Sequence, residues 1–355
     1  MKIAILTLTK NGQSLALKIS KKLENDPTVI KMDIFHKNVR KTLNDIFSGY
    51  DCILGIMATG IMVRNVCSLI KSKTEDPAVL VMDEKGKHVI SLLSGHLGGG
   101  NEFTLKIAQI TGADPVITSA TDVNGKMGVD SMARKYHLFT DDPGKIMPIN
   151  LALVNDDVVE LYLPSSLQFI YTDDLVRRSY TRSSSPSKLS LTKTKDLEEL
   201  VSPDNEKFPL PNNVEVSHGR NKLVLRPKKL VVGLGSRKGV TAESVLGAVK
   251  QALNILDIPL ERIDLLATAE PKKNENGMVE TARELGLPLR IIPLIDLKDF
   301  NHSDISESSM VREVFGVAGV CEPAALIGAG RGSKLILRKT VFNKVTVAVA
   351  VSKNP

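Results

Sequence analysis

The sequence predicts an α/β protein with two α/β domains, each with a mainly parallel sheet, joined by a small, loop-rich middle segment. Two observations support this fold class. Short apolar runs alternate with segments of helical periodicity near both ends of the chain, and residues 145–226 interrupt that alternation. Strands alternating with helices are typical of a parallel sheet covered on both faces. We therefore expect an N-terminal domain over 1–144 and a C-terminal domain over 227–355.

The elements of the first domain follow from hydrophobic periodicity. The turn Glu84-Lys-Gly-Lys87 lies between two apolar runs and indicates a β-hairpin. Apolar runs predict strands at 2–9, 29–35, 52–57, 78–83, 88–93 and 115–120. Apolar residues at helical spacing predict helices at 12–23, 61–70, 101–112 and 130–136.

The middle segment has a different pattern. Residues 149–164 predict two strands around an Asn-Asp-Asp turn, and the serine- and lysine-rich stretch 181–195 predicts a mobile surface loop. A second strand–helix series then begins at KLVVGLG. We expect strands at 229–235, 263–269 and 290–295, helices at 241–256, 276–286, 308–316 and 322–330, and a closing hairpin at 334–352 around Asn343.

Composition limits the classes of partner. Aromatic residues make up 4% of the chain and tryptophan is absent, which argues against a ligand held mainly between stacked rings. The net charge of +7 fits either nucleic acid or a polyanionic small molecule. Because no Arg/Lys stripe with interleaved aromatics is visible, we expect the small molecule and no nucleic acid.

Cellular location is predicted from apolar runs and cysteines. No run is long enough to cross a bilayer, so no membrane is expected, and the apolar part of MKIAILTLTK is too short for a signal peptide. Cys52, Cys67 and Cys321 lack CxxC spacing. This pattern favours reduced thiols in a cytoplasmic protein over a disulfide or a metal site.

Ligands of open α/β sheets bind beyond the carboxyl ends of strands, near helix N-termini. SGHLGGGNE, residues 94–102, is one of four stretches of this kind. It places His96, a candidate general base, beside three glycines that leave the backbone bare, and it contains Asn101, a candidate helix cap. The alternative is a tight turn with a structural histidine. The four stretches are Ala58–Gly60 with Arg64, Ser94–Glu102, Thr118–Asp122 and Gly233–Gly239.

Two carboxylates are further catalytic candidates. Asp122 ends the hydroxyl-rich stretch that contains Thr118, Ser119 and Thr121, and Asp130 precedes SMARKY. The structural alternatives are that Asp122 closes a turn with the residues after it, and that Asp130 caps the following helix. For Asp130 the structural alternative is slightly favoured.

The fourth stretch carries two cations, Arg237 and Lys238, between glycines at a helix start, which suits an anion. A dinucleotide site fits it poorly, because the spacing is GxGxxxG and Glu270 lies too far along the chain to bind a ribose. The chain also lacks metal-ligand spacing, a GxSxG elbow and a Walker loop.

Long stretches of the chain resemble one known family, the cobalt-precorrin-5A hydrolases (CbiG) of anaerobic cobalamin biosynthesis. Its N-terminal domain is similar to TGIMVRN, DPAVLVMDEKGKHVISLLSGH and GHLGGGNEFTLKIAQITGADPVITSATDVNGKMGVDSMA. Its C-terminal domain, which also resembles the stand-alone protein CobE, is similar to KLVVGLGSRKGVTAESV, EPKKNENGMVETA and VCEPAALIGAG. The middle segment matches only in length and position.

The resemblance implies a polyanionic cobalt macrocycle as substrate, a tetrapyrrole-derived ring whose lactone is opened by water before acetaldehyde leaves. The cobalt arrives with the substrate, so no cofactor and no protein-bound metal is expected. Lactone opening needs a base and oxyanion donors. We assign these roles, from residue type and position, to His96 and to backbone N–H groups near Gly99 to Asn101; Asp122 or Asp130 would serve in the later deprotonation.

The residues expected to bind substrate are Thr59, Gly60, Arg64, Gly98, Gly99, Gly100, Asn101, Glu102, Thr118, Ser119, Thr121, Gly233, Gly235, Arg237, Lys238, Gly239 and Glu322. Two other classes stay open: a macrocycle carrier without catalysis, and a nucleotide-dependent oxidoreductase. A homodimer and contacts with other cobalamin-pathway enzymes also stay open.

Overall fold

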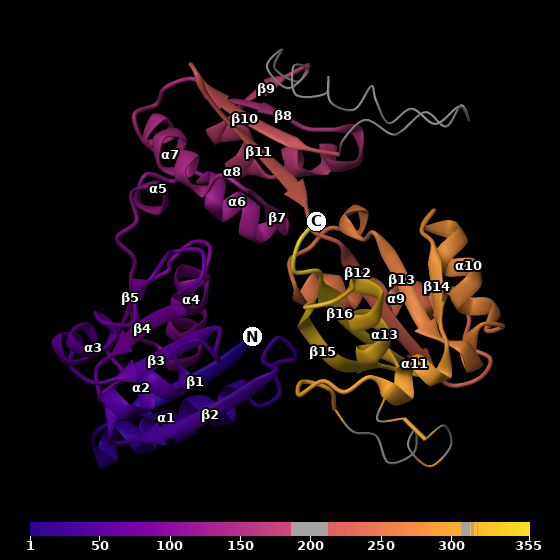
Figure 1. The fold of residues 1–355 in the computed structure, drawn as a ribbon, viewed down its shortest axis with the longest axis horizontal. Coiled ribbons are helices and arrows are strands. Elements are labelled where there is room, and N and C mark those ends of the chain that lie inside the picture. The colour runs from indigo at the N-terminus through magenta and orange to yellow at the C-terminus, as the bar shows by residue number, and fades with distance from the viewer. Residues whose placement is uncertain (186–211, 307–312, 314–315, 318) are drawn as a thin grey trace. The chain divides into compact units, whose positions relative to one another are not determined.

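The computed structural model describes residues 1–185, 212–306, 313, 316–317 and 319–355. These residues form three sheets covered by helices, which confirms the predicted α/β class (Figure 1). The chain divides into two compact units: Met1–Thr118 with Lys228–Asn354, and Ser119–Pro227. None of the helices in the described ranges is both long and apolar enough to cross a membrane.

The N-terminal sheet has both faces covered. Its strands are β1 (Lys2–Thr7), β2 (Lys31–His36), β3 (Cys52–Ile56), β4 (Ala78–Met82), β5 (His88–Leu93) and β6 (Asp114–Val116), in the order β2-β1-β3-β4-β5-β6. Its helices are α1 (Lys10–Leu23), α2 (Val39–Ile46), α3 (Thr59–Val66) and α4 (Gly100–Thr111). Alternate strand residues pack on α1 and α4 in one apolar cluster and on α2 and α3 in the other.

Strand direction changes within this sheet. The predicted hairpin is confirmed: β4 and β5 are antiparallel, with Val79 beside Leu93. Strand β6 is parallel to β5, whereas β1, β3 and β4 are parallel to one another. The carboxyl ends of β5 and β6 therefore lie at the opposite edge of the sheet from those of β1, β3 and β4.

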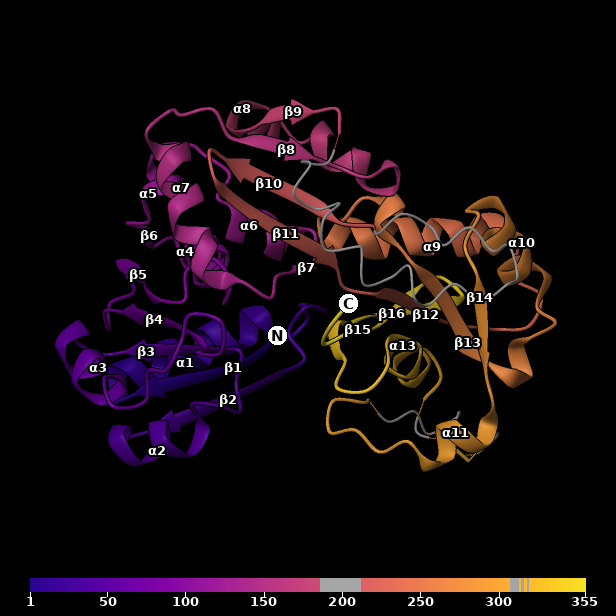
Figure 2. The ribbon, with the colours of Figure 1, turned by 45° about the horizontal axis from the view of Figure 1, so that its top comes forward.

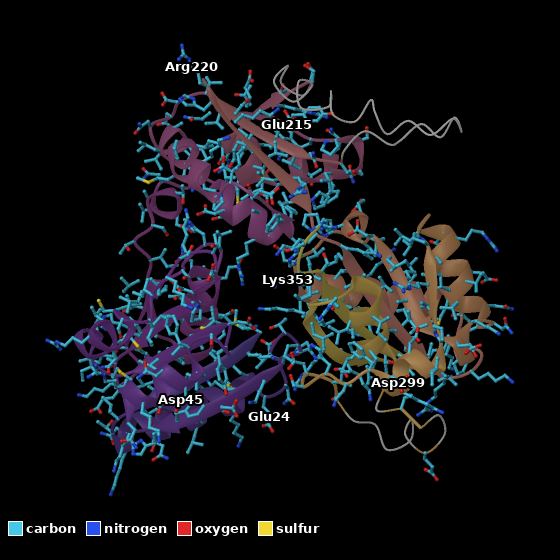
Figure 3. The ribbon with its side chains drawn as sticks, viewed as in Figure 1. Glu24, Asp45, Glu215, Arg220, Asp299 and Lys353 are labelled. Carbon is cyan, nitrogen blue, oxygen red and sulfur yellow. The ribbon has the colours of Figure 1, made fainter. Side chains whose placement is uncertain are left out.

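The middle unit contains a mainly antiparallel sheet. Its strands are β7 (Leu138–Phe139), β8 (Glu160–Tyr162), β9 (Thr181–Ser183), β10 (Val214–His218) and β11 (Asn221–Pro227), in the order β7-β11-β10-β8-β9. Arg220 projects from the tip of the β10–β11 hairpin (Figure 3). The helices are α5 (Ala120–Val123), α6 (Val129–Lys135), α7 (Ile146–Val154) and α8 (Asp174–Ser179), with 3₁₀ turns η1 (Pro143–Lys145) and η2 (Ser165–Thr172).

Two expectations for this region are wrong. The first half of the expected strand pair at 149–164 is helix α7, which buries Ile149 and Leu153 while Met147 and Leu151 are exposed. A run that is apolar on every side does not distinguish a helix from a strand. The expected strand at 115–120 ends at Val116, and α5 begins at Ala120.

Residues 119–144, expected in the N-terminal domain, belong to the compact middle unit. There β7 pairs with β11, placing Phe139 beside Arg226, and α6 packs on α7. Residues 186–195 of the expected surface loop lie outside the described residues.

The C-terminal sheet is also covered on both faces (Figure 2). Its strands are β12 (Leu230–Ser236), β13 (Leu265–Ala269), β14 (Leu289–Ile292), β15 (Lys334–Phe342) and β16 (Val345–Val351), in the order β14-β13-β12-β16-β15. Helices α9 (Ala242–Ile255) and α10 (Asn276–Glu284) pack on one face, and α11 (Leu294–Asp299) and α13 (Cys321–Ala329) on the other. Short 3₁₀ turns are η5 (Leu260–Arg262) and η6 (Glu270–Lys272).

The predicted closing hairpin is confirmed, since β15 and β16 are antiparallel and Asn343 at the turn has φ 56°. The predicted strand at 290–295 is shorter than expected, because α11 begins at Leu294. The expected helix at 308–316 lies mostly outside the described residues.

Candidate active site

The loop after β5 closes on itself through backbone hydrogen bonds. The N–H of Gly99 donates to the carbonyl of His96 at 2.9 Å, that of Gly100 to Ser94 at 3.1 Å, and that of Asn101 to Gly95 at 2.9 Å. These three N–H groups are the oxyanion donors expected from the sequence. Because each already has an acceptor within the loop, that expectation is wrong for this conformation.

Two of the loop glycines are required by packing. A Cβ at Gly98 would lie 2.5 Å from the Cβ of Ser94, and a Cβ at Gly100 would lie 3.1 Å from the carbonyl oxygen of Leu93. Contacts this short are essentially never found for real side chains at the first position and are tight at the second. The tight-turn alternative therefore accounts for these two glycines without a ligand.

Asn101 does not cap α4. The N-cap is Gly99, with φ 82°, and Asn101 lies buried within the first helical turn. Its Oδ1 would be 2.6 Å from a Cβ placed on Gly95, so the amide side chain packs directly against the loop. Glu102, in the same turn, is exposed and interacts favourably with the positive end of the helix dipole. His96 is half-buried.

The candidates around α3 lie at the other edge of the N-terminal sheet. Thr59 begins α3, and the Arg64 guanidinium donates to the carbonyl of Gly60 at 3.2 Å. Since β5 is antiparallel to β4, the length of a strand, roughly 15 Å, separates this edge from the edge that carries His96. The structure thus does not bring these two groups of candidates together.

The candidates of the stretch Thr118–Asp122 divide into an exposed and a buried set. Thr118 is exposed, and the Ser119 hydroxyl donates to the exposed Asp122 carboxylate at 2.6 Å. Thr121 is buried, and its Oγ1 would lie 3.3 Å from a Cβ on Gly128.

Asp130 does not cap a helix, since the N-cap of α6 is Gly128. It is buried, and its carboxylate accepts from the Asn150 amide at 2.8 Å, while the Asn150 carbonyl oxygen accepts from the backbone of Val129 at 2.8 Å. Burial, together with the negative charge of Asp130, raises the pKa of Tyr180 well above its usual value. Asp130 therefore belongs to a buried polar network of the middle unit.

Packing explains the first two glycines of the C-terminal loop. A Cβ on Gly233 would lie 1.9 Å from the carbonyl oxygen of Cys321, and one on Gly235 would lie 2.5 Å from the hydroxyl of Thr346. Burial, followed by the nearby charge of Glu322, raises the pKa of the Cys321 thiol to about 12. Gly233 thus lies against α13, and Gly235 lies against the neighbouring strand β16.

Glu322 was expected to bind substrate, but it is buried and already has three donors. Its carboxylate accepts from the Ser306 N–H at 2.8 Å, from the Ser306 hydroxyl at 2.6 Å and from the Lys339 N–H at 2.8 Å. These bonds join α13 to the segment before it and to β15. In this conformation Glu322 has a structural role.

The cationic part of the C-terminal loop is open to solvent. Arg237 and Lys238 are exposed, and the Arg237 N–H donates to the carbonyl of Lys344 at 3.1 Å. Gly239 has φ 77° and donates its N–H to Glu275 at 3.0 Å, which in turn lies 3.6 Å from the Lys272 ammonium. This edge of the C-terminal sheet thus carries cations from three separate segments.

Sequence reasoning missed Lys344 and Ser94. The sequence signal for Lys344 was available: a hairpin strand that pairs antiparallel with β12 places its turn beside the end of β12, where Ser236 pairs with Val345.

Among the described residues, no group of three or more His, Cys, Asp or Glu side chains could hold a metal ion.

Comparisons with known proteins identify the family. The model described as Cobalamin synthesis G N-terminal matches residues 41–122, and that described as Cobalamin synthesis G C-terminus matches 230–350. A protein of Methanocaldococcus jannaschii named probable cobalt-precorrin-5A hydrolase is 33% identical, over 99% of both chains. The chain belongs to the cobalamin synthesis G family.

Further relatives span nearly the whole of this cobalamin synthesis G protein. The cobalt-precorrin-5A hydrolase of Salmonella typhimurium is 30% identical and covers 99% of this chain and 97% of its own. A crystal structure of a cobalamin biosynthesis protein G homologue from Sulfolobus solfataricus, 24% identical, superposes with a TM-score of 0.55 over 99% of this chain and 97% of the other, and so shares the fold.

The two family models include every predicted site residue of this cobalamin synthesis G protein except Asp130, which lies between them. His96 and Asp122 fall in the N-terminal match, and Arg237 and Glu322 in the C-terminal match. The middle unit beyond residue 122 therefore lies outside both family models.

We expect Glu322→Ala to destabilise this cobalamin synthesis G protein by about 2–5 kcal/mol, because it removes the buried acceptor of three hydrogen bonds, from the Ser306 N–H and hydroxyl and from the Lys339 N–H. Denaturant unfolding of the full chain measures this loss. Glu280→Ala, which removes an exposed carboxylate from α10, is the control and should change stability by less than about 0.5 kcal/mol. Equal midpoints for the two variants would contradict the structural role of Glu322.

Proposed function

We propose that this chain is a cobalt-precorrin-5A hydrolase, which opens the substrate lactone with water and releases acetaldehyde by carbon–carbon cleavage. The observation that carries the proposal is similarity along the whole chain: relatives of that name are 33% and 30% identical while covering 99% of it. The reaction class of a carbon–carbon hydrolase follows from the proposed substrate.

The first chemical step requires a base for the attacking water. His96 is our candidate, because imidazole changes protonation near neutral pH and this side chain is half-buried in a loop held by its own backbone hydrogen bonds. For the deprotonation that precedes carbon–carbon cleavage we propose Asp122 before Asp130. A substrate can reach an exposed carboxylate, whereas Asp130 is buried and bonded to Asn150.

The substrate class agrees with the charge of the C-terminal domain. Acetate and propionate arms make the macrocycle polyanionic, and charge-assisted hydrogen bonds to carboxylates are among the stronger polar contacts in proteins. Arg237 and Lys238 are exposed at a helix start, beside the backbone of Lys344. Cobalt arrives as part of this substrate, and no resident cofactor is proposed.

We further propose a cytoplasmic location. The three cysteines are free thiols in the structure, and Cys67 is exposed, which fits a reducing compartment.

Incubation of the full chain with cobalt-precorrin-5A, with trapping of acetaldehyde, tests the proposed function. We expect one acetaldehyde per substrate converted. Tight binding of the intact macrocycle with no acetaldehyde would instead support a carrier, the alternative suggested by the 30% identity of protein CobE to 34% of this chain.

A further inference from the structure

Two buried hydroxyl groups of the N-terminal domain have no hydrogen-bond partner within the described part of the chain. They are Ser94 Oγ, in the loop that carries His96, and Thr104 Oγ1, inside α4. Buried polar groups normally find a partner, so each exception needs an explanation. Taken as whole residues, Thr104 is fully buried within a helix, whereas Ser94 is half-buried at a strand end, although its hydroxyl oxygen is buried.

Ser94 has a second unfavourable feature. Its φ of 54° lies in the left-handed region, which costs an L-residue other than glycine conformational energy. The loop contains four glycines, any of which would adopt this conformation without strain, yet serine occupies the position. Strained residues that persist in this way concentrate at functional sites.

The rest of the loop is built around this serine. Gly98 must be a glycine because its missing Cβ would lie 2.5 Å from the Cβ of Ser94 and 2.7 Å from its carbonyl oxygen. That carbonyl accepts the N–H of Gly100 at 3.1 Å. The loop therefore fixes the position of the Ser94 backbone from two sides, and with it the small volume in which the hydroxyl can lie.

We propose that the Ser94 hydroxyl is the donor that binds the developing oxyanion when the lactone opens, an inference that rests on the proposed function. The N–H groups of Gly99, Gly100 and Asn101 already donate within the loop, whereas the Ser94 hydroxyl has no partner among the described residues. Ser94 carries the one hydroxyl of the stretch 94–101. Rotation about its Cα–Cβ bond moves the oxygen between staggered positions and presents it to substrate without a backbone change.

In this step the oxygen of water bonds to the lactone carbonyl carbon while His96 takes the water proton. The carbonyl electron pair moves onto oxygen, where the Ser94 O–H donates a hydrogen bond. As the carbonyl reforms, the ring C–O bond breaks, and the leaving alkoxide receives the proton from His96. The products are a carboxylic acid and a hydroxyl group, so atoms and electrons balance with no further reactant.

The test compares Ser94→Ala with Thr104→Val in the full chain. Both changes remove a buried hydroxyl that lacks a partner, so both should leave the denaturation midpoint unchanged or raised. Only Ser94→Ala should slow turnover, by about 10²- to 10³-fold in kcat with KM nearly unchanged, because an oxyanion donor acts mainly in the transition state. Thr104→Val should turn over at the wild-type rate.

Wild-type kcat in a folded Ser94→Ala variant would overturn the proposal. If the alanine variant does not fold, Ser94→Gly, which suits a positive φ, should fold and be equally slow; failure of both to fold also overturns the proposal. A wild-type chain that releases no acetaldehyde contradicts the proposed function itself, and this outcome is distinct from the others.

Discussion

His96→Ala should slow turnover by about 10²- to 10⁴-fold while the chain stays folded, as expected for loss of a general base. The loop should keep its shape, because the Gly99 N–H bonds to the backbone carbonyl of residue 96, which alanine retains. In the wild type, kcat/KM should rise with pH as the imidazole loses its proton, since only the neutral ring accepts a proton from water. This rise should be absent from the variant.

Steady-state acetaldehyde release between pH 5 and 9 measures both effects. His88→Ala is the matched control: His88 is an exposed histidine at the start of β5, at the far end of the strand that leads into the loop. It should retain the wild-type rate and pH profile. Wild-type turnover by His96→Ala at saturating substrate would make the histidine structural, and Asp122 would become the leading candidate for the base.

Hydrophobic periodicity predicted most of the strand–helix alternation, because amphipathic patterns record which face of an element is buried. This prediction failed where the amphipathic pattern of an element is weak. The α7 sequence IMPINLALV is apolar on every side, and its residues 149–154 carry a strand prediction, whereas the polar helix α2 (Val39–Ile46) carries no prediction. Both helices are defined by tertiary packing, which propensity alone does not contain.

The candidate site was predicted less well, because its geometry depends on backbone hydrogen bonds and close contacts between residues. The glycines around His96 signalled an unusual loop, but nothing in SGHLGGGNE reveals that three N–H groups bond within it or that Ser94 has a positive φ. Gly233 belongs to a glycine loop whose cations suit an anion, yet its lack of a side chain is required by the carbonyl of Cys321. Strand order and register, which the sequence does not state, decide such contacts.

Replacing Arg237 and Lys238 together with alanine should weaken substrate binding by roughly 30- to 1000-fold, or about 2–4 kcal/mol, because charge-assisted hydrogen bonds contribute about 1.5–3 kcal/mol each and are not fully additive. Neither side chain has an ion-pair partner within the ranges that the structure describes, so both are available to a carboxylate arm. The fold should persist, since the Arg237 backbone bond to Lys344 does not involve the replaced atoms.

Titration of the macrocycle into the slow His96→Ala chain, with and without the double replacement, measures the loss under conditions where the substrate survives. The control is Lys250→Ala with Lys353→Ala, which removes the same charge from exposed positions on α9 and after β16. Lys353, labelled in Figure 3, follows the end of β16 that pairs with Leu230, and so lies at the opposite edge of the sheet from Arg237. Added salt should weaken binding to the parent chain more than to the Arg237 and Lys238 double variant, because screening acts on the charges that the variant lacks. Equal affinities for the parent and this double variant would mean that the glycine loop is only a turn and that other cations bind the carboxylates.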